Sequence, residues 1–174
     1  MKRCVAVIGF MVLAHCAVGN GSNPPGEPAA ESNERAVLQH RVIAEGGYGP
    51  GALQAGRRSP WVEIALDQAK LTELWAAYVS DDPAPAIDFT NSAVILLLMG
   101  PRSTGGYSIE LHDLEMDDRV IRVKADLHEP APESMVTQAF TAPHIAILVN
   151  TRDFDSVEWI NRDRLLWTEL LSEP

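Results

Sequence analysis

The stretch AVILLLM, residues 93–99, decides what kind of fold this chain can form. It is an unbroken apolar run, too short to cross a bilayer, and Asn91 and Gly100 bound it. A short apolar run without alternation is typical of a strand that is buried on both faces. We therefore expect residues 93–99 to form a buried strand inside a globular domain.

The segments downstream of this run predict further strands and a terminal helix. Residues 107–112 and 120–127 alternate between apolar and polar side chains, as half-buried strands do, and the polar turn between them predicts an antiparallel hairpin. Another strand is expected at 144–149. Leucines and Trp167 recur through residues 161–171, which predicts a short C-terminal helix.

A helix is predicted upstream of the run. Asp67 can offer a side-chain oxygen to the unpaired amide groups at a helix start. The apolar residues that follow have the i, i+3, i+4, i+7 spacing of one helix face: Leu71, Leu74, Trp75 and Tyr78. Short strands are expected at 37–44 and 61–64. Together these elements predict an α+β fold: a single, mostly antiparallel β-sheet with one packed amphipathic helix and a short C-terminal helix.

The N-terminus predicts export. Lys2 and Arg3 precede an apolar run at 5–13, which has the size of a signal-peptide core and is too short to span a bilayer. We expect a signal peptide at 1–19 and a flexible linker at 20–34, where Gly, Pro, Ser and Asn are abundant. The globular domain is expected to occupy 35–174.

The sequence is compatible with two alternative cleavage sites for the signal peptide. Residues 13–16, LAHC, resemble a bacterial lipobox in which Cys16 becomes the lipidated first residue, although His15 stands where that pattern has a small residue. Alternatively, residues 17–19 form a small-x-small site for ordinary signal peptidase, which leaves Cys16 in the discarded peptide. Both alternatives place the protein in the cell envelope or periplasm, with membrane contact only through the lipid anchor.

Charge and cysteine content exclude several functional classes. The formal net charge is −10, and an acidic surface repels nucleic acid, so we expect no nucleic-acid partner. Both cysteines, Cys4 and Cys16, precede the globular domain, which excludes a disulfide or a cysteine-ligated zinc site within it. The histidines show no metal-ligand spacing, and we expect no metal and no cofactor.

The loop GPRSTGG, residues 100–106, is the main candidate for function. Its glycines allow positive φ and let backbone N–H groups approach a ligand. It does not fit a phosphate loop, because Gly106 replaces the required lysine, and the chain has no Gly-x-Ser-x-Gly nucleophile motif. We assign no catalytic residue. The candidate partner-binding residues are Arg102, Thr104, Gly105, Gly106 and Tyr107. The alternative is a turn whose glycines serve its geometry alone.

Four motifs follow one another along the chain: GY at 47–48, IDF at 87–89, RSTGGYSI at 102–109 and VTQAFTAP at 136–143. Their order and spacing resemble the PrcB C-terminal domain family of exported, often lipid-anchored bacterial proteins. That family is named after a non-catalytic subunit of a protease complex. The resemblance therefore implies a non-enzymatic accessory protein that binds an envelope or secreted protein, one candidate being a protease that it stabilises.

The same loop admits a second functional class. A Thr-Gly-Tyr turn enters the protease cleft in chagasin-like cysteine-protease inhibitors, and residues 104–107 offer a similar Thr-Gly-Gly-Tyr turn. A protease inhibitor presenting this loop is the alternative function. A hydrolase with a dispersed catalytic site is a third alternative, and no motif supports it.

Overall fold

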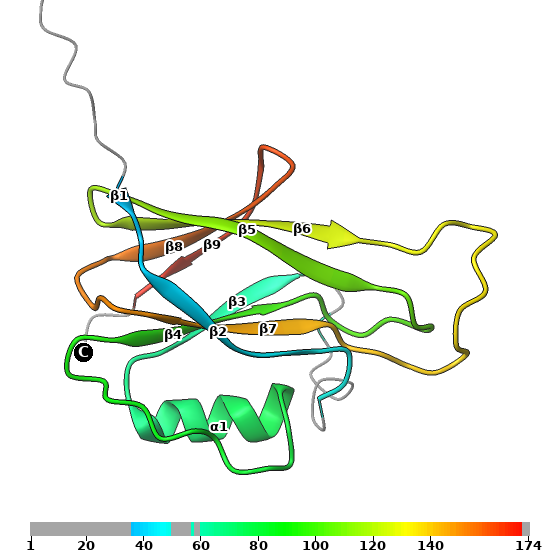
Figure 1. The fold of residues 1–174 in the computed structure, drawn as a ribbon, viewed down its shortest axis with the longest axis horizontal. Coiled ribbons are helices and arrows are strands. Elements are labelled where there is room, and N and C mark those ends of the chain that lie inside the picture. Colours follow the sequence, from blue (N-terminus) through cyan, green and yellow to red (C-terminus); the bar gives the residue numbers. More distant parts are fainter. Residues whose placement is uncertain (1–35, 50–56, 58–59, 172–174) are drawn as a thin grey trace, which may run out of the picture. The chain divides into compact units, whose positions relative to one another are not determined.

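The computed structural model describes residues 36–49, 57 and 60–171, all within one compact unit, Asn33–Pro174. The predicted signal peptide, the linker and Cys16 lie outside the described residues. The described part contains nine strands and a single helix, and its strands form two sheets (Figure 1). The predicted α+β fold with a single sheet is therefore wrong, because the domain is mostly β. None of the described helical sequence is long and apolar enough to cross a membrane.

Each sheet combines strands from distant parts of the chain. The first sheet has the strand order β1 (Ala36–Val37), β5 (Ser108–Asp117), β6 (Val120–His128), β8 (Ser156–Asn161) and β9 (Arg164–Leu170). The second has the order β2 (His40–Gly46), β7 (His144–Val149), β4 (Ala93–Leu98) and β3 (Trp61–Ala65). Neighbouring strands are antiparallel except β6 and β8, which are parallel.

Strand β4 confirms the prediction of a strand buried on both faces. All six of its side chains are buried. Ile95 and Leu97 belong to the core between the sheets, whereas Leu96 and Leu98 pack with helix α1 (Gln68–Tyr78) on the outer face. Figure 1 shows α1 lying along this sheet. Continuous apolar sequence is required here because alternate side chains of one strand point to opposite faces.

The predicted helix start is also confirmed. Asp67 is the N-cap, and its Oδ1 accepts a hydrogen bond from the Lys70 backbone N–H at 2.8 Å. Leu71, Leu74 and Trp75 are the buried residues of α1. The cap satisfies one of the amide groups that a helix start leaves unpaired.

The predicted C-terminal helix is wrong, because residues 164–170 form strand β9. Arg162 and Asp163 have φ values of 48° and 62°, and they turn the chain tightly between β8 and β9. Two successive positive φ angles are typical of the two-residue turns that join β-hairpin strands. Trp167 then lies opposite Trp159 of β8. β8 supplies hydrogen-bond partners for the backbone of residues 164–170, and this pairing outweighs the helix that the spacing of the leucines predicts.

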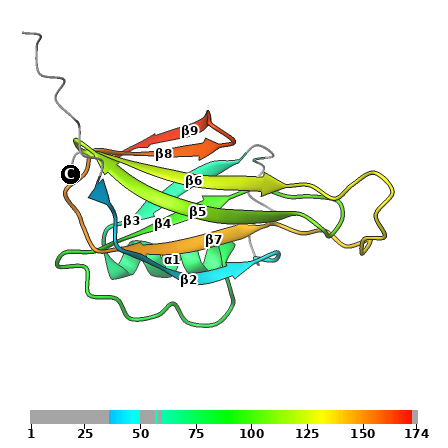
Figure 2. The same cartoon turned by 45° about the horizontal axis from the view of Figure 1, so that its top comes forward.

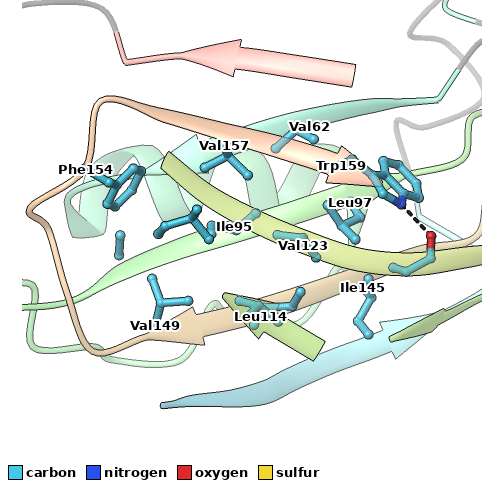
Figure 3. Packing of buried hydrophobic residues seen from close by; sticks show 14 residues of the cluster. Val62, Ile95, Leu97, Leu114, Val123, Ile145, Val149, Phe154, Val157 and Trp159 are labelled. Atoms are coloured by element: carbon cyan, nitrogen blue, oxygen red, sulfur yellow. Dashed lines mark hydrogen bonds between the residues drawn. The ribbon is translucent and has the colours of Figure 1, made fainter. Parts of the chain in front are cut away.

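The inner core lies between the two sheets. Figure 3 shows side chains from both sheets pointing toward one another, with Phe154 and Trp159 among the largest. The Trp159 indole Nε1 donates to the Ala125 carbonyl oxygen at 2.8 Å. Trp159 is thus buried together with a satisfied polar atom, as a core tryptophan requires.

The two sides of the sandwich are closed differently. At the β3 and β9 side, the Arg57 guanidinium lies 5.6 Å from the ring centre of Trp61 and 5.0 Å from that of Trp167. At the other side, the predicted strand 37–44 is divided between the sheets (Figures 1 and 2). β1 pairs with β5, the Leu38 N–H donates to the Leu114 carbonyl at 2.9 Å, and the chain then crosses to pair β2 with β7.

Candidate functional site

Two loops project together from one end of the sheets, and we call them the paired loops: residues 99–107, between β4 and β5, and residues 129–143, between β6 and β7 (Figures 1 and 2). Arg102 N–H donates to the Thr141 carbonyl at 2.7 Å, and Thr141 N–H donates back to the Arg102 carbonyl at 3.0 Å. Gly105 N–H donates to the Thr137 carbonyl at 2.9 Å. The fold thus brings together residues that lie 32 and 39 positions apart in the sequence.

The glycines of the first loop are needed for this pairing. A Cβ at Gly105, which is buried, would lie 2.3 Å from the Thr137 hydroxyl. Gly106 has φ +84°, and its Cβ would lie 2.9 Å from Val136 Cγ1. Both positions therefore exclude larger residues for geometric reasons, which favours a structural role for the two glycines.

The other candidate residues of this loop are half-buried. The Arg102 guanidinium lies 5.6 Å from the Tyr107 ring centre, within the range of a cation–π contact. The Thr104 carbonyl accepts a hydrogen bond from the Thr141 hydroxyl at 2.8 Å. Arg102 and Tyr107 are therefore ordered by the fold and still partly accessible to another molecule.

Two large apolar side chains of the second loop are exposed, and sequence reasoning missed them. Met135 has an exposed fraction of 103% and Phe140 one of 66%. Tyr48 is also exposed, and it follows Gly47, whose carbonyl accepts a hydrogen bond from Ala142 N–H at 2.6 Å. The available signal was an aromatic residue and a methionine within a segment bounded by Pro130 and Pro143, where no strand or helix would bury them.

A groove of about 1050 Å³ adjoins the paired loops and runs between strands of the two sheets. Its lining comprises His40, Val42, Glu45, Gly46, Gly47, Tyr107, Ser108, Ile109, Glu110, Leu111, His112, His128, His144 and Ile145. All four histidines of the predicted globular domain are among them. The described residues nevertheless contain no group of three histidine, cysteine or carboxylate side chains that could hold a metal ion.

The groove histidines differ in their surroundings. His144 is 4% exposed, its Nδ1 lies 3.2 Å from the Ala142 carbonyl, and burial lowers the pKa of its imidazole. His128 Nε2 lies 2.6 Å from a Glu110 carboxylate oxygen. Among the described residues that line the groove, none is lysine or arginine, whereas Glu45 and Glu110 are acidic. The groove therefore presents carboxylates, imidazoles and apolar side chains to any ligand.

Comparison with known proteins identifies one family. Residues 93–150 match the model of the family described as PrcB C-terminal. The match begins at the first residue of β4 and ends one residue after β7, so it includes both paired loops. It confirms the predicted resemblance over this range, which includes the motifs at 102–109 and 136–143, whereas the motifs at 47–48 and 87–89 lie outside the match. No curated protein and no solved structure matches the chain.

Proposed function

Because residues 93–150 match the model of the PrcB C-terminal family, we propose that this protein is a non-enzymatic, exported accessory protein that binds an envelope or secreted protein. The family points to a subunit related to protease complexes. The partner that we propose is therefore a secreted protease, which the protein stabilises within a complex.

One observation carries this proposal: the paired loops combine order with exposed apolar surface. Met135 and Phe140 are exposed in solvent, although apolar side chains of this size gain free energy when they are buried. Contiguous exposed apolar surface is typical of interaction sites, and we infer such a surface from these two side chains on one ordered loop. Aromatic side chains also contribute strongly to binding energy at protein interfaces.

The backbone hydrogen bonds between the loops support the same proposal. A segment that is already ordered loses little conformational entropy when it docks, so more of the contact energy remains as affinity. The bonds through Arg102, Thr141 and Gly105 hold the loops together in this way. Arg102, whose backbone bonds to Thr141 next to Phe140, adds a cationic group beside Tyr107.

The experiment that tests the proposal is affinity capture of the full-length chain from its native envelope, compared with a Met135→Ser/Phe140→Ser variant. A Val37→Ser/Leu165→Ser variant is the matched control, because Val37 and Leu165 are exposed apolar residues on β1 and β9, outside the paired loops. We expect a stoichiometric secreted protease with the wild type and the control, and its loss with the loop variant. Recovery of the protein alone after mild crosslinking, or equal loss with both variants, would contradict the proposal.

The alternative function, inhibition of a protease by insertion of residues 104–107, has weaker geometric support. An inserting loop must present its residues to a cleft, yet Gly105 is buried and the Thr104 carbonyl is occupied by Thr141. Assays with small peptide substrates separate the two functions. An inhibitor blocks their hydrolysis, whereas an accessory subunit leaves it unchanged or increases it.

A further inference from the structure

Among the residues that the structure describes, strand β5 is only partly paired along the edge that faces away from β6. β1 pairs there with Met116 and Glu115, and Leu38 bonds to Leu114 before the chain crosses to the second sheet. Between Ser108 and Asp113, β6 is the only described strand that pairs with β5. This uncovered part of the edge borders the groove, and we call it the β5 edge.

The backbone of Ile109 points outward along the β5 edge. Ile109 lies opposite Leu127 of β6, and the Leu127 N–H donates to Asn161 Oδ1 at 3.2 Å, away from β5. Opposite residues in an antiparallel pair direct their backbone groups either toward each other or both outward. The Ile109 N–H and carbonyl therefore face the groove side, where an additional strand can pair with them.

The walls of the groove would accept alternating side chains. Ile109 and Leu111 are partly buried and pack against the inner core, whereas Ser108, Glu110 and His112 are exposed on the other face of β5. The second sheet contributes Val42, which is 39% exposed, whereas Ile145 belongs to the core and is only 2% exposed. A strand beside β5 would thus place every second side chain against apolar residues and the others near Glu110.

The charge and the length of the β5 edge narrow the class of ligand. Glu45 and Glu110 line the groove without any lysine or arginine from the described lining, so basic side chains are favoured. The six residues of the edge extend about 20 Å, because a strand rises about 3.3 Å per residue. That length suits an extended peptide of about six residues better than a compact small molecule.

We propose that this groove binds an extended peptide segment of the protein partner as an added strand on the β5 edge, and that the segment alternates apolar and basic residues. Main-chain hydrogen bonds supply affinity in this mode of recognition, and alternate side chains supply specificity. A second copy of the chain is a poorer occupant, because pairing two β5 edges would bring acidic grooves together. The inference rests on the proposed function in one respect: the peptide segment belongs to the protein partner proposed above.

The test uses the full-length chain and a fluorescent nine-residue peptide that alternates valine and lysine. Two further peptides carry N-methyl groups on alternate amides, one peptide for each set, and all three keep the same charge. We expect only one methylated peptide to bind at least tenfold more weakly, because an added strand directs one set of amides toward β5. Hydrogen exchange should show protection of the Ile109 amide by the unmodified peptide. Equal affinity of the three peptides, loss with both methylated peptides, or protection confined to other segments would overturn the proposal.

Two variants of the chain test the same geometry. Ile109→Pro removes the edge N–H without removing a hydrogen bond to β6, and we expect at least tenfold weaker peptide binding, whereas Ile109→Val should bind normally. Glu110→Lys should also weaken binding of the lysine peptide, while the same charge change in Glu73→Lys, on α1 outside the groove, should have a much smaller effect. Unchanged peptide binding by a folded Ile109→Pro variant would overturn strand addition. If that variant does not fold, the affinities of the two N-methylated peptides for the wild type test strand addition instead.

The outcomes separate this inference from the proposed function. If the loop variant loses the captured protease and the valine–lysine peptide fails to bind, only strand addition is wrong. If the peptide binds along β5 and capture recovers no partner, the accessory function is wrong and the groove has another peptide ligand.

Discussion

Replacing Gly105 by alanine tests whether the paired loops depend on the absence of a side chain there. The new methyl group would lie 2.3 Å from the Thr137 hydroxyl, whereas the next atoms of Thr137 are 3.6 and 3.7 Å away, which is ordinary contact. The conflict is therefore with one hydroxyl group. It can be relieved by rotation of the Thr137 side chain or by separation of the loops, which would weaken the 2.9 Å hydrogen bond from Gly105 N–H.

Either form of relief lowers the free energy of unfolding of Gly105→Ala. Forcing a side chain into a packed site costs about 1–3 kcal/mol. Alanine also restricts the unfolded chain, which returns about 0.4–1 kcal/mol. We expect Gly105→Ala to lower the free energy of unfolding by about 1–2 kcal/mol. Thr137→Ala alone removes an exposed side chain and should change it by no more than about 0.5 kcal/mol.

The double variant Gly105→Ala/Thr137→Ala supplies the decisive comparison. Without the hydroxyl, the new methyl group keeps only ordinary contacts, so the stability should return to within about 0.5 kcal/mol of the wild type. Urea unfolding followed by tryptophan fluorescence measures each variant. A coupling free energy of about 1–2 kcal/mol supports the geometry. Additive effects of the two substitutions would refute the contact and the structural role assigned to Gly105.

Gly106→Ala is the matched contrast. Its φ of +84° is strained for alanine, and its Cβ would meet Val136 and Pro130 rather than Thr137. Thr137→Ala should therefore not rescue it. Gly105→Trp would be unsuitable for a binding test, because an indole at this buried position would separate the paired loops. Met135 and Phe140 are better positions for a binding test.

Three other predictions concern stability, measured by urea unfolding. Burial lowers the pKa of His144 from its usual 6.5, so its stabilising contribution is complete above pH 6.5 and is lost as the pH falls toward the lowered pKa, at up to about 1.4 kcal/mol per pH unit. His144→Phe should reduce this dependence, and an unchanged slope would contradict the assignment. Asp67→Ala should cost about 1 kcal/mol through loss of the N-cap, whereas Asp67→Ser should retain most of it. Trp159→Phe should cost about 1–3 kcal/mol, because the Ala125 carbonyl loses its buried donor, and a neutral result would be inconsistent with the 2.8 Å bond.

The local pattern of apolar and polar residues was sufficient to predict several strands and the helix. The apolar run at 93–98 became a strand buried on both faces, and Asp67 with the apolar spacing after it became a capped helix. The predicted hairpin became β5 and β6, although β5 continues to Asp117 and thus includes residues expected to form the turn. These elements depend on side-chain periodicity and on hydrogen bonds between near neighbours, which a sequence displays directly.

The arrangement of strands into two sheets depended on contacts between distant residues. Alternation indicates that one face of a strand is buried, but it does not say which strands lie beside it. The chain crosses between the sheets after Val37, within what the sequence presented as one strand, and residues 164–170 pair with β8 instead of forming a helix. Backbone pairing with another strand decided both outcomes: β5 and β7 lie far along the chain from residues 36–46, whereas β8 directly precedes β9.

Some features of the candidate site also follow from the sequence alone, whereas others depend on the tertiary structure. The sequence by itself determined the glycine loop, the family resemblance and the absence of cysteine from the domain, because each is a matter of residue identity and order. Only the tertiary structure paired that loop with residues 136–142, gathered four histidines along one groove and left part of the β5 edge without a described strand beside it. Those features arise where segments distant in sequence meet, and packing and backbone hydrogen bonding across the whole domain select which segments do so.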